Sequence, residues 1–513
     1  MTYRHGVYTS ETATSIQAAP AVDSALPFVV GTAPVEIGPV LVTTWASFCS
    51  KFGVSQSVDI NSDEYSRGGT LTNFAYYWFV LAGRGDCIMQ SLPSDHFAGD
   101  ELDLVVGDQT IVARYVADIS AVSESARSAV RRALSGAKIN ISFDTDYDVT
   151  VVSASGTSYT ATLSSASSVS AFTITVDSAT VSFGIKDVST GSDVSGAVFA
   201  DGVTSIGVGV CAYGESVSGA SVVTPAISNI HTIYERFGRV ASVLAAPYIN
   251  EVDGVAPAMV SAVESIGGRF KGVALIDMPS GYNAELVSLD GLSAAKPTTS
   301  PFAILGWPYV GVGVYRFPAS VAIAAAINSV DAQYGGVPYV SPSNKALPVT
   351  GSYTKTNGAE SPVFLTRDDV NTYLGAHGIS GFRNTASGWV VWGDNTAAFP
   401  GNADVKDYMI PVRRMFNFIA NQFQIFCDSR VDLPLNRRQL DGVVNSFSQY
   451  LAGLIGFGAL NAASISLDSD LNTTDELLAG TVHFKILIAP PPAMVAIEGN
   501  LEYDVSGFEA ALA

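Results

Sequence analysis

Apolar strand-like segments alternate with amphipathic helical patterns in two parts of the chain, and this alternation restricts the possible folds more than any other feature. In the first part the strand patterns lie at 26–31, 40–43 and 87–90, and the helical patterns at 45–52 and 71–81. In the second part the strand patterns lie at 239–246, 270–277 and 302–310, and the helical patterns at 227–237, 256–266 and 318–330. Strands connected through helices run parallel. The pattern predicts one α/β layer with a mostly parallel sheet, formed by residues 21–95 plus 216–395.

Residues 96–215 interrupt this rhythm and differ in composition. Between 151 and 210 the chain has 22 Ser or Thr among 60 residues, with one Lys and no Arg. Polarity alternates in stretches such as 171–176, which is typical of short antiparallel strands. An apolar stripe along 116–134 predicts one helix. We expect a β-rich insertion domain rather than a Ser-rich linker, because Val, Ile and Phe recur regularly.

The last part of the chain changes pattern again. Apolar residues along 412–427 line one helical face, and Asn436 with Gln439 predicts the start of a second helix with its apolar stripe along 440–454. Two alternating strand patterns follow, at 482–488 and 495–505. We therefore expect an α+β domain over residues 396–492 and a terminal strand arm over 493–513.

The balance of charge restricts what the protein can bind. The chain has 27 Lys and Arg against 47 Asp and Glu, a formal net charge of −20, and only 14% of its residues are charged. Because phosphate backbones and anionic membrane surfaces bind clustered basic charge, we expect neither nucleic acid nor a membrane among the partners. A large protein with so few charges either buries much of its surface against other subunits or lies in a membrane.

Two long charge-poor runs test the membrane alternative. The run at 442–467 contains several Asn, Ser, Gln and Gly residues, and the run at 297–315 contains three prolines. Both are better interpreted as buried protein core. The first residues contain no apolar stretch, so we expect no signal peptide. The four cysteines lie far apart without a CxxC pair, which favours structural thiols in a reducing compartment.

Motifs for chemistry are lacking in the sequence. The five histidines are isolated, and there is no phosphate-binding loop, dinucleotide loop or GxSxG elbow. The acidic runs at 144–148 and 468–472 begin like calcium loops, but each lacks the Gly at the sixth position and the Glu at the twelfth. We expect no catalytic residue, no metal and no cofactor.

The two ends of the chain are the candidate functional segments. A polar, extended-looking stretch of residues 1–20 and an alternating strand pattern at the other end are unusual in a self-contained domain. Free strand edges pair with other chains. An extended arm that adds a strand to a neighbouring sheet forms a registered link through backbone hydrogen bonds. If each subunit donates an arm to the next, the contacts are heterologous and generate rings or open helices.

A series of short stretches leads from these observations to a family. In chain order they are His5-Gly-Val-Tyr8, 29–34, 39–43, 318–331, 336–344, 378–389, 392–396, 412–414 and 478–491. In this order they resemble the tail sheath proteins of contractile-tailed, myovirus-type bacteriophages. Residues 96–215 resemble the variable insertions that such proteins carry.

The resemblance implies a fold and a mechanical function. It implies a multidomain α/β and α+β protein with a subtilisin-like α/β core that lacks protease chemistry, a β-rich insertion domain facing outward, and a C-terminal α+β domain lining the tail tube. It implies an N-terminal arm over residues 1–20 and a C-terminal arm over 493–513. The residues expected to make the inter-subunit strands are Tyr3, His5, Val7, Tyr8, Val495, Ile497, Leu501 and Tyr503.

The resemblance also implies a set of partners. Copies of the chain would form stacked rings around a tube, and contraction would drive the tube through the host envelope. The partners would be the tail tube protein, the baseplate and tail terminator or neck proteins. The protein would be a component of the virion tail, assembled in the host bacterial cytoplasm, and not an enzyme.

Three alternatives remain open at this stage. The first is the same machine in another setting, a bacteriocin-like or secretion-type contractile sheath. The second is a serine hydrolase on the implied core fold. The third is a secreted glycan-binding β protein, suggested by the Ser/Thr-rich unit.

Overall fold

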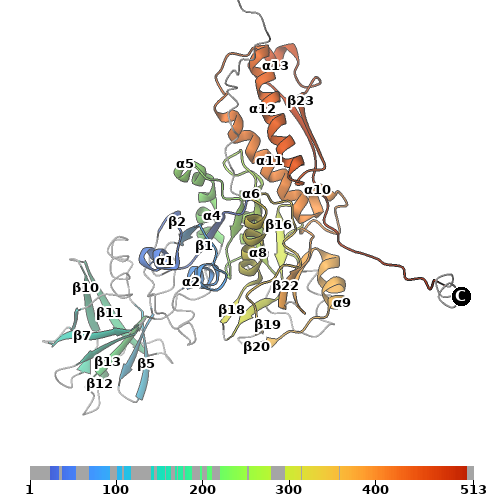
Figure 1. The fold of residues 1–513 in the computed structure, drawn as a ribbon. Helices are drawn as coiled ribbons and strands as arrows, with labels where there is room; N and C mark the ends of the chain where they lie inside the picture. The colour runs from blue at the N-terminus through green and yellow to red at the C-terminus, as the bar shows by residue number, and fades with distance from the viewer. Residues whose placement is uncertain are drawn as a thin grey trace, which may run out of the picture.

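A parallel sheet of eight strands forms the centre of the protein (Figure 1). The structure, a computed structural model, describes residues 24–33, 37–52, 69–92, 220–250, 254–278, 295–313, 315–356, 359–386 and 388–504, and the backbone of the strands between 101 and 210. The sheet order is β2 (Val40–Val42), β3 (Cys87–Ser91), β1 (Pro27–Gly31), β14 (Val243–Ala245), β15 (Val273–Asp277), β16 (Ala303–Gly306), β21 (Ile379–Thr385) and β22 (Gly388–Trp392). The pairs from β3 to β21 are parallel, and the edge strands β2 and β22 pair antiparallel. The predicted mostly parallel sheet is confirmed.

Helices cover both faces of this sheet because its central strands are apolar apart from Asp277 at the end of β15. Every residue of β1, β14, β15 and β16 is buried. One face packs against α1 (Trp45–Phe52), α2 (Gly69–Ala75), the π-helix η2 (Tyr76–Leu81) and α8 (Ala319–Gln333). The other packs against α4 (Ala220–Ser228), η4 (Asn229–Thr232), α5 (Ile233–Phe237), α6 (Val255–Glu264) and part of the C-terminal unit. The predicted helices therefore form in the expected order.

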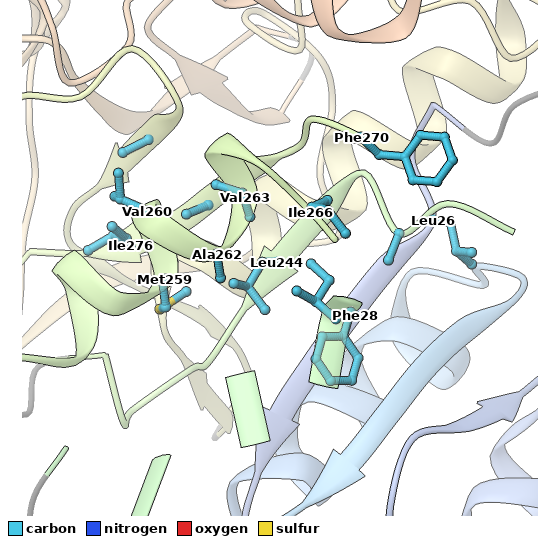
Figure 2. Close-up of a cluster of buried hydrophobic side chains, with 14 of the residues drawn as sticks. Leu26, Phe28, Leu244, Met259, Val260, Ala262, Val263, Ile266, Phe270 and Ile276 are labelled. Atoms are coloured by element: carbon cyan, nitrogen blue, oxygen red, sulfur yellow. The ribbon is translucent and has the colours of Figure 1, made fainter. Parts of the chain in front are cut away.

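The contact between α6 and the sheet shows how the layers hold together. Figure 2 shows Met259 and Val263 of α6 beside Leu244 of β14 and Phe28 of β1. None of these four side chains is exposed to solvent. Cutting a buried side chain of this size to alanine costs about 2–5 kcal/mol, so this packing contributes a substantial share of the stability of the core.

The expected single strand over 302–310 is wrong, because the structure divides it into two strands in different sheets. The break falls at Trp307 and Pro308, where Trp307 N donates to Ser380 O at 3.0 Å and proline has no N–H to continue a ladder. The second half becomes part of a four-stranded antiparallel sheet. Its order is β18 (Tyr315–Phe317), β17 (Tyr309–Val312), β19 (Gly351–Thr356) and β20 (Ala359–Pro362).

The strands between 101 and 210 pair with one another and not with the central sheet. Eight of them close an antiparallel barrel, in the order β10, β11, β5, β4, β13, β8, β7 and β6, and two more form a small sheet. Their bounds are β4 (Glu101–Val106), β5 (Gln109–Val116), β6 (Asn140–Phe143), β7 (Tyr147–Ser155), β8 (Ser158–Thr162), β9 (Ser168–Val169), β10 (Ala171–Val176), β11 (Ala179–Asp187), β12 (Ala197–Val198) and β13 (Ser205–Val210). The helix expected over 116–134 lies outside the described residues, apart from Val116 at the end of β5.

Two long helices and a two-stranded sheet form the C-terminal unit, drawn in orange and red at the top of Figure 1. Several short elements precede it in the chain: α9 (Arg367–Asp369), η5 (Val370–Leu374) and η6 (Gly375–His377) before β21, and α10 (Val405–Tyr408) after β22. Its own elements are α11 (Ile410–Asp428), α12 (Arg437–Gly456), β23 (Ala462–Leu467), α13 (Thr474–Leu478) and β24 (Phe484–Ala489). Asn436 caps α12 by accepting a 3.0 Å hydrogen bond from Gln439 N, so the predicted helix start is confirmed.

The final strand pattern, expected over 495–505, has no counterpart in the single chain. Residues 490–504 have neither helix nor strand. A strand needs a partner for its backbone hydrogen bonds, and polarity alternation alone does not provide one. In the part of the chain that the structure describes, no helix is both long and apolar enough to span a membrane.

Candidate self-assembly surface

The sheet of β23 and β24 has open edges. The two strands pair antiparallel from Ala462 opposite Ala489 to Leu467 opposite Phe484. Within the described residues neither strand pairs with a third strand. Each strand therefore has an outer row of backbone N–H and C=O groups directed away from its partner, the arrangement to which a strand from another chain can pair.

One face of this small sheet is fixed to the helices. Phe484, Ile486 and Ile488 of β24 pack against the core, whereas Lys485, Leu487 and Ala489 between them are exposed. Leu487 is 57% exposed. This alternation is typical of an antiparallel strand with one face on a core, and it holds the open edges at a defined position.

An aromatic cluster on α11 and α12 packs against the buried face of the β23–β24 sheet. Phe447 of α12 is fully buried, and its ring centroid lies 5.0 Å from that of Phe423 and 5.5 Å from that of Phe426, both on α11. The Phe423 ring in turn contacts Phe484 of β24 at 5.8 Å. The apolar stripes of the two helices, predicted from their 3.6-residue period, therefore meet each other and the sheet.

The C-terminal segment leaves the body of the protein beside this unit. At the start of this segment Ala493 N donates a hydrogen bond to Met409 Sδ at 3.3 Å. Figure 1 shows the segment running away from the rest of the chain. The four residues expected in the C-terminal arm are highly exposed: Val495 (70%), Ile497 (84%), Leu501 (101%) and Tyr503 (73%). Contiguous exposed apolar side chains are typical of interaction sites.

The N-terminal candidates cannot be placed in the same way. Tyr3, His5, Val7 and Tyr8 lie outside the described residues. The described chain begins at Ser24, whose hydroxyl donates to Asp331. Both Ser24 and Asp331 are buried at the junction with the C-terminal unit.

A polar seam joins the C-terminal unit to the central core. Arg414 of α11 forms a buried ion pair with Asp331 of α8, with both side chains at most 3% exposed. On later turns of α11, Asn417 Nδ2 donates to Gly272 O at 3.0 Å and Gln424 Nε2 to Arg269 O at 2.6 Å. Sequence reasoning missed this seam because it followed only apolar residues. The spacing of Asn417, Asn421 and Gln424 on one helical face was the available signal.

Sequence reasoning also missed a buried polar cluster at the carboxyl end of β15. The carboxylate of Asp277 accepts hydrogen bonds from Ser320 N and Oγ, both at 2.6 Å, and from Asn250 Nδ2 at 2.9 Å. All three residues are at most 3% exposed. A nucleophilic serine needs a general base and access to substrate. Ser320 Oγ instead donates a hydrogen bond to the carboxylate of Asp277 inside the core. This hydrogen bond and the one from Ser320 N fix the start of α8.

Of the two acidic runs, the one at 468–472 shows no ligand geometry, and the one at 144–148 lies outside the residues whose side chains the structure describes. Asp468 Oδ1 accepts from the backbone N–H groups of Asp470 and Leu471, at 3.0 and 3.3 Å, so this carboxylate closes a turn. No group of three or more His, Cys, Asp or Glu residues in the described ranges could hold a metal ion.

The fold and the surface together define a class: a protein of mixed α/β fold that has a small open-edged sheet and an exposed apolar C-terminal segment. Comparison with known proteins identifies the members of this class that the chain resembles. No family model matches the chain. A tail sheath protein of Burkholderia phage BcepMu is 29% identical over 150 residues, which is 28% of this chain and 31% of that protein. The match therefore covers less than a third of its relative.

Solved structures match over nearly the whole chain. The helical sheath of the anti-feeding prophage (AFP) in its contracted state matches with a TM-score of 0.53 and 16% identity, covering 98% of this chain and 100% of that one. The sheath complex of PVC, an extracellular contractile injection system, in the contracted state has a TM-score of 0.52 and 15% identity, covering 99% of each chain. At this identity the likeness concerns the fold. The mixed α/β fold is that of contractile sheath proteins, and the predicted resemblance to tail sheath proteins is confirmed.

Proposed function

We propose that this protein is the structural subunit of a contractile phage tail sheath, polymerising helically around a tail tube and contracting to drive the tube through the host envelope. One observation carries the proposal: an open-edged β23–β24 sheet fixed on two helices, beside an exposed apolar C-terminal segment. Sequence similarity to a tail sheath protein and fold similarity to contracted sheaths support it.

Strand addition gives the physical link between neighbours. An extended segment that pairs with an edge of β23 or β24 satisfies its backbone groups and places alternate side chains on the exposed face near Leu487. In this proposal Val495, Ile497, Leu501 and Tyr503 form the C-terminal strand, and Tyr3, His5, Val7 and Tyr8 the N-terminal one. Contraction further requires two packings of different free energy, between which such links keep neighbours together.

The division into functional parts follows the same proposal. Residues 21–95 plus 216–395 form a subtilisin-like core without protease activity, 96–215 an outward-facing insertion, and 396–492 the domain next to the tube. Residues 1–20 and 493–513 are the arms. The partners are further copies of this chain, the tail tube protein, the baseplate and tail terminator or neck proteins. Assembly takes place in the host bacterial cytoplasm and the product is the virion tail.

A pair of matched substitutions tests the proposal. Ile497→Asp places a charge in the proposed strand, and we expect soluble protein that no longer forms striated tubes in negative-stain electron microscopy. Phe364→Asp is the control, because Phe364 is 81% exposed but lies outside both arms. Deletion of residues 1–19 is expected to abolish tubes as well. Normal tubes from Ile497→Asp and from the deletion would contradict the proposal.

A second setting has its own supporting observation. Two of the solved structures with a similar fold come from AFP and from PVC, an extracellular contractile injection system, whereas the tail sheath protein with a similar sequence comes from a phage. The same subunit mechanics would serve a bacteriocin-like or secretion-type sheath. The genes beside this one decide between the settings: capsid and packaging genes indicate a phage, and their absence beside tube and baseplate genes indicates an injection system.

A further inference from the structure

A small cavity with both polar and apolar walls lies within the seam between α11 and the central core. Its walls are formed by Ser24, Ser242, Lys271, Val273, Arg414, Asn417, Phe418 and Asn421. The volume within which the centre of a water molecule fits is about 10 Å³. A single buried water needs about this much room, together with two to four polar partners.

One wall residue has an unsatisfied polar atom. Asn417 is 4% exposed, and its Oδ1 has no hydrogen-bond partner among the described residues. Turning the amide over does not solve this, because Nδ2 donates to Gly272 O at 3.0 Å and a carbonyl oxygen can only accept. A buried acceptor without a donor costs about 1–3 kcal/mol, so native structures supply one.

The polar groups that line the cavity determine which molecule can bind in it. The unsatisfied atom is an acceptor, and an anion such as chloride has no proton to donate to it. Arg414 and Lys271 repel a cation. Three of the five N–H groups of Arg414 bond to Asp331 and Ser24, which leaves the guanidinium able to donate further. A water molecule can both donate to Asn417 Oδ1 and accept from Arg414.

We propose that this cavity holds one ordered water, which donates to Asn417 Oδ1 and completes the polar seam between α11 and the residues leading into β15. With this water, Asn417 has a hydrogen-bond partner for both atoms of its side-chain amide, as Asn421 does. The water is a structural element of the joint between the C-terminal unit and the core, independent of the proposed function.

Two substitutions at Ser242 test this, because Ser242 lines the cavity and both remove its hydroxyl. Ser242→Ala keeps the room for the water, whereas Ser242→Val fills the room with methyl groups. If a water is present, Val displaces it and leaves Asn417 Oδ1 unpaired, so the denaturation midpoint of Ser242→Val falls below that of Ser242→Ala. If the cavity is dry, the added methyl groups gain packing, and a Val midpoint equal to or above that of Ala overturns the proposal.

A high-resolution structure of the full chain provides the second measurement, because strain around valine could lower the midpoint by itself. We expect a density peak about 2.7–3.2 Å from Asn417 Oδ1 in the wild type and in Ser242→Ala, and none in Ser242→Val. A wild-type map at a resolution that shows other buried waters but no peak here would overturn the proposal, whatever the midpoints.

Discussion

Asn421 holds the backbone of Lys271 through both of its amide atoms: Oδ1 accepts from Lys271 N and Nδ2 donates to Lys271 O, each at 2.8 Å. Asn421 lies on α11 and Lys271 lies just before β15, 150 residues earlier in the chain. The side-chain amide acts here as a strand edge would, since it offers one donor and one acceptor to one residue. This contact joins the C-terminal unit to the central core at a fixed register.

Removing this amide should weaken the whole chain. Asn421→Ala leaves the N–H and C=O of Lys271 without their partner in a site where Asn421 is 1% exposed. We expect a loss of about 1–3 kcal/mol in the free energy of unfolding, measured by chemical denaturation. Asn445→Ala is the matched control, because Asn445 lies exposed on α12 and should change stability by less than about 0.5 kcal/mol. Equal effects of the two substitutions would show that the seam contributes nothing.

Breaking the buried ion pair should cost more. Arg414→Met leaves the carboxylate of Asp331 buried and uncompensated, and we expect about 3–5 kcal/mol of destabilisation in thermal unfolding. The exposed pair of Arg437 and Asp441, one helical turn apart, provides the comparison. Arg437→Met should cost less than about 1 kcal/mol. A mild effect of Arg414→Met would mean that water reaches Asp331.

The aromatic cluster under β24 gives a third prediction. Phe447→Ala opens a cavity beside Phe423 and Phe426, and we expect a cost of about 3–5 kcal/mol. Phe457→Ala, just after the same helix, removes a ring that is 50% exposed and should cost much less. If the cluster supports the open-edged sheet, hydrogen exchange at β23 and β24 should rise in Phe447→Ala and stay unchanged in Phe457→Ala.

The thiol of Cys427 should respond to pH. Burial raises its pKa from 9.0 to about 11, partly offset by the nearby charge of Arg430. Below pH 9 the thiol is neutral in both states. Between pH 9 and about 11 it ionises in the unfolded chain before it does in the folded one, so its contribution to stability is lost as pH rises through this window.

Alkylation of the native protein, followed at the peptide that contains Cys427, measures this directly. The rate should be low at pH 8 and climb toward pH 11, because the thiolate is the reactive form. The same peptide in denaturant is the reference for an ordinary thiol. Equal rates in the native and denatured states at pH 8 would contradict the raised pKa.

Local patterns were sufficient for much of the fold. The alternation of apolar strands with helices predicted the parallel sheet, since burial on both faces leaves continuous apolar runs such as 27–31. The helices α11 and α12 followed from their 3.6-residue stripes, and the cap at Asn436 from its spacing to Gln439. For the candidate surface, the sequence predicted an inter-subunit strand over 495–503. These residues are exposed in the single chain, and their role in assembly stays a prediction.

The tertiary structure decided what depends on residues far apart in the chain. Periodicity reports which side of an element is buried, but not which residue lies opposite, so Asn421 with Lys271 and Asp277 with Ser320 had no local signature. No sequence pattern predicted a role for the polar face of α11, which is buried against backbone groups that form hydrogen bonds with its side-chain amides. The break at Pro308 was not predicted, because it depends on β16 and β17 belonging to different sheets. The sequence by itself determined the elements and their buried faces. Their partners were decided by long-range packing, because hydrogen-bond complementarity exists only once the chain has brought both groups together.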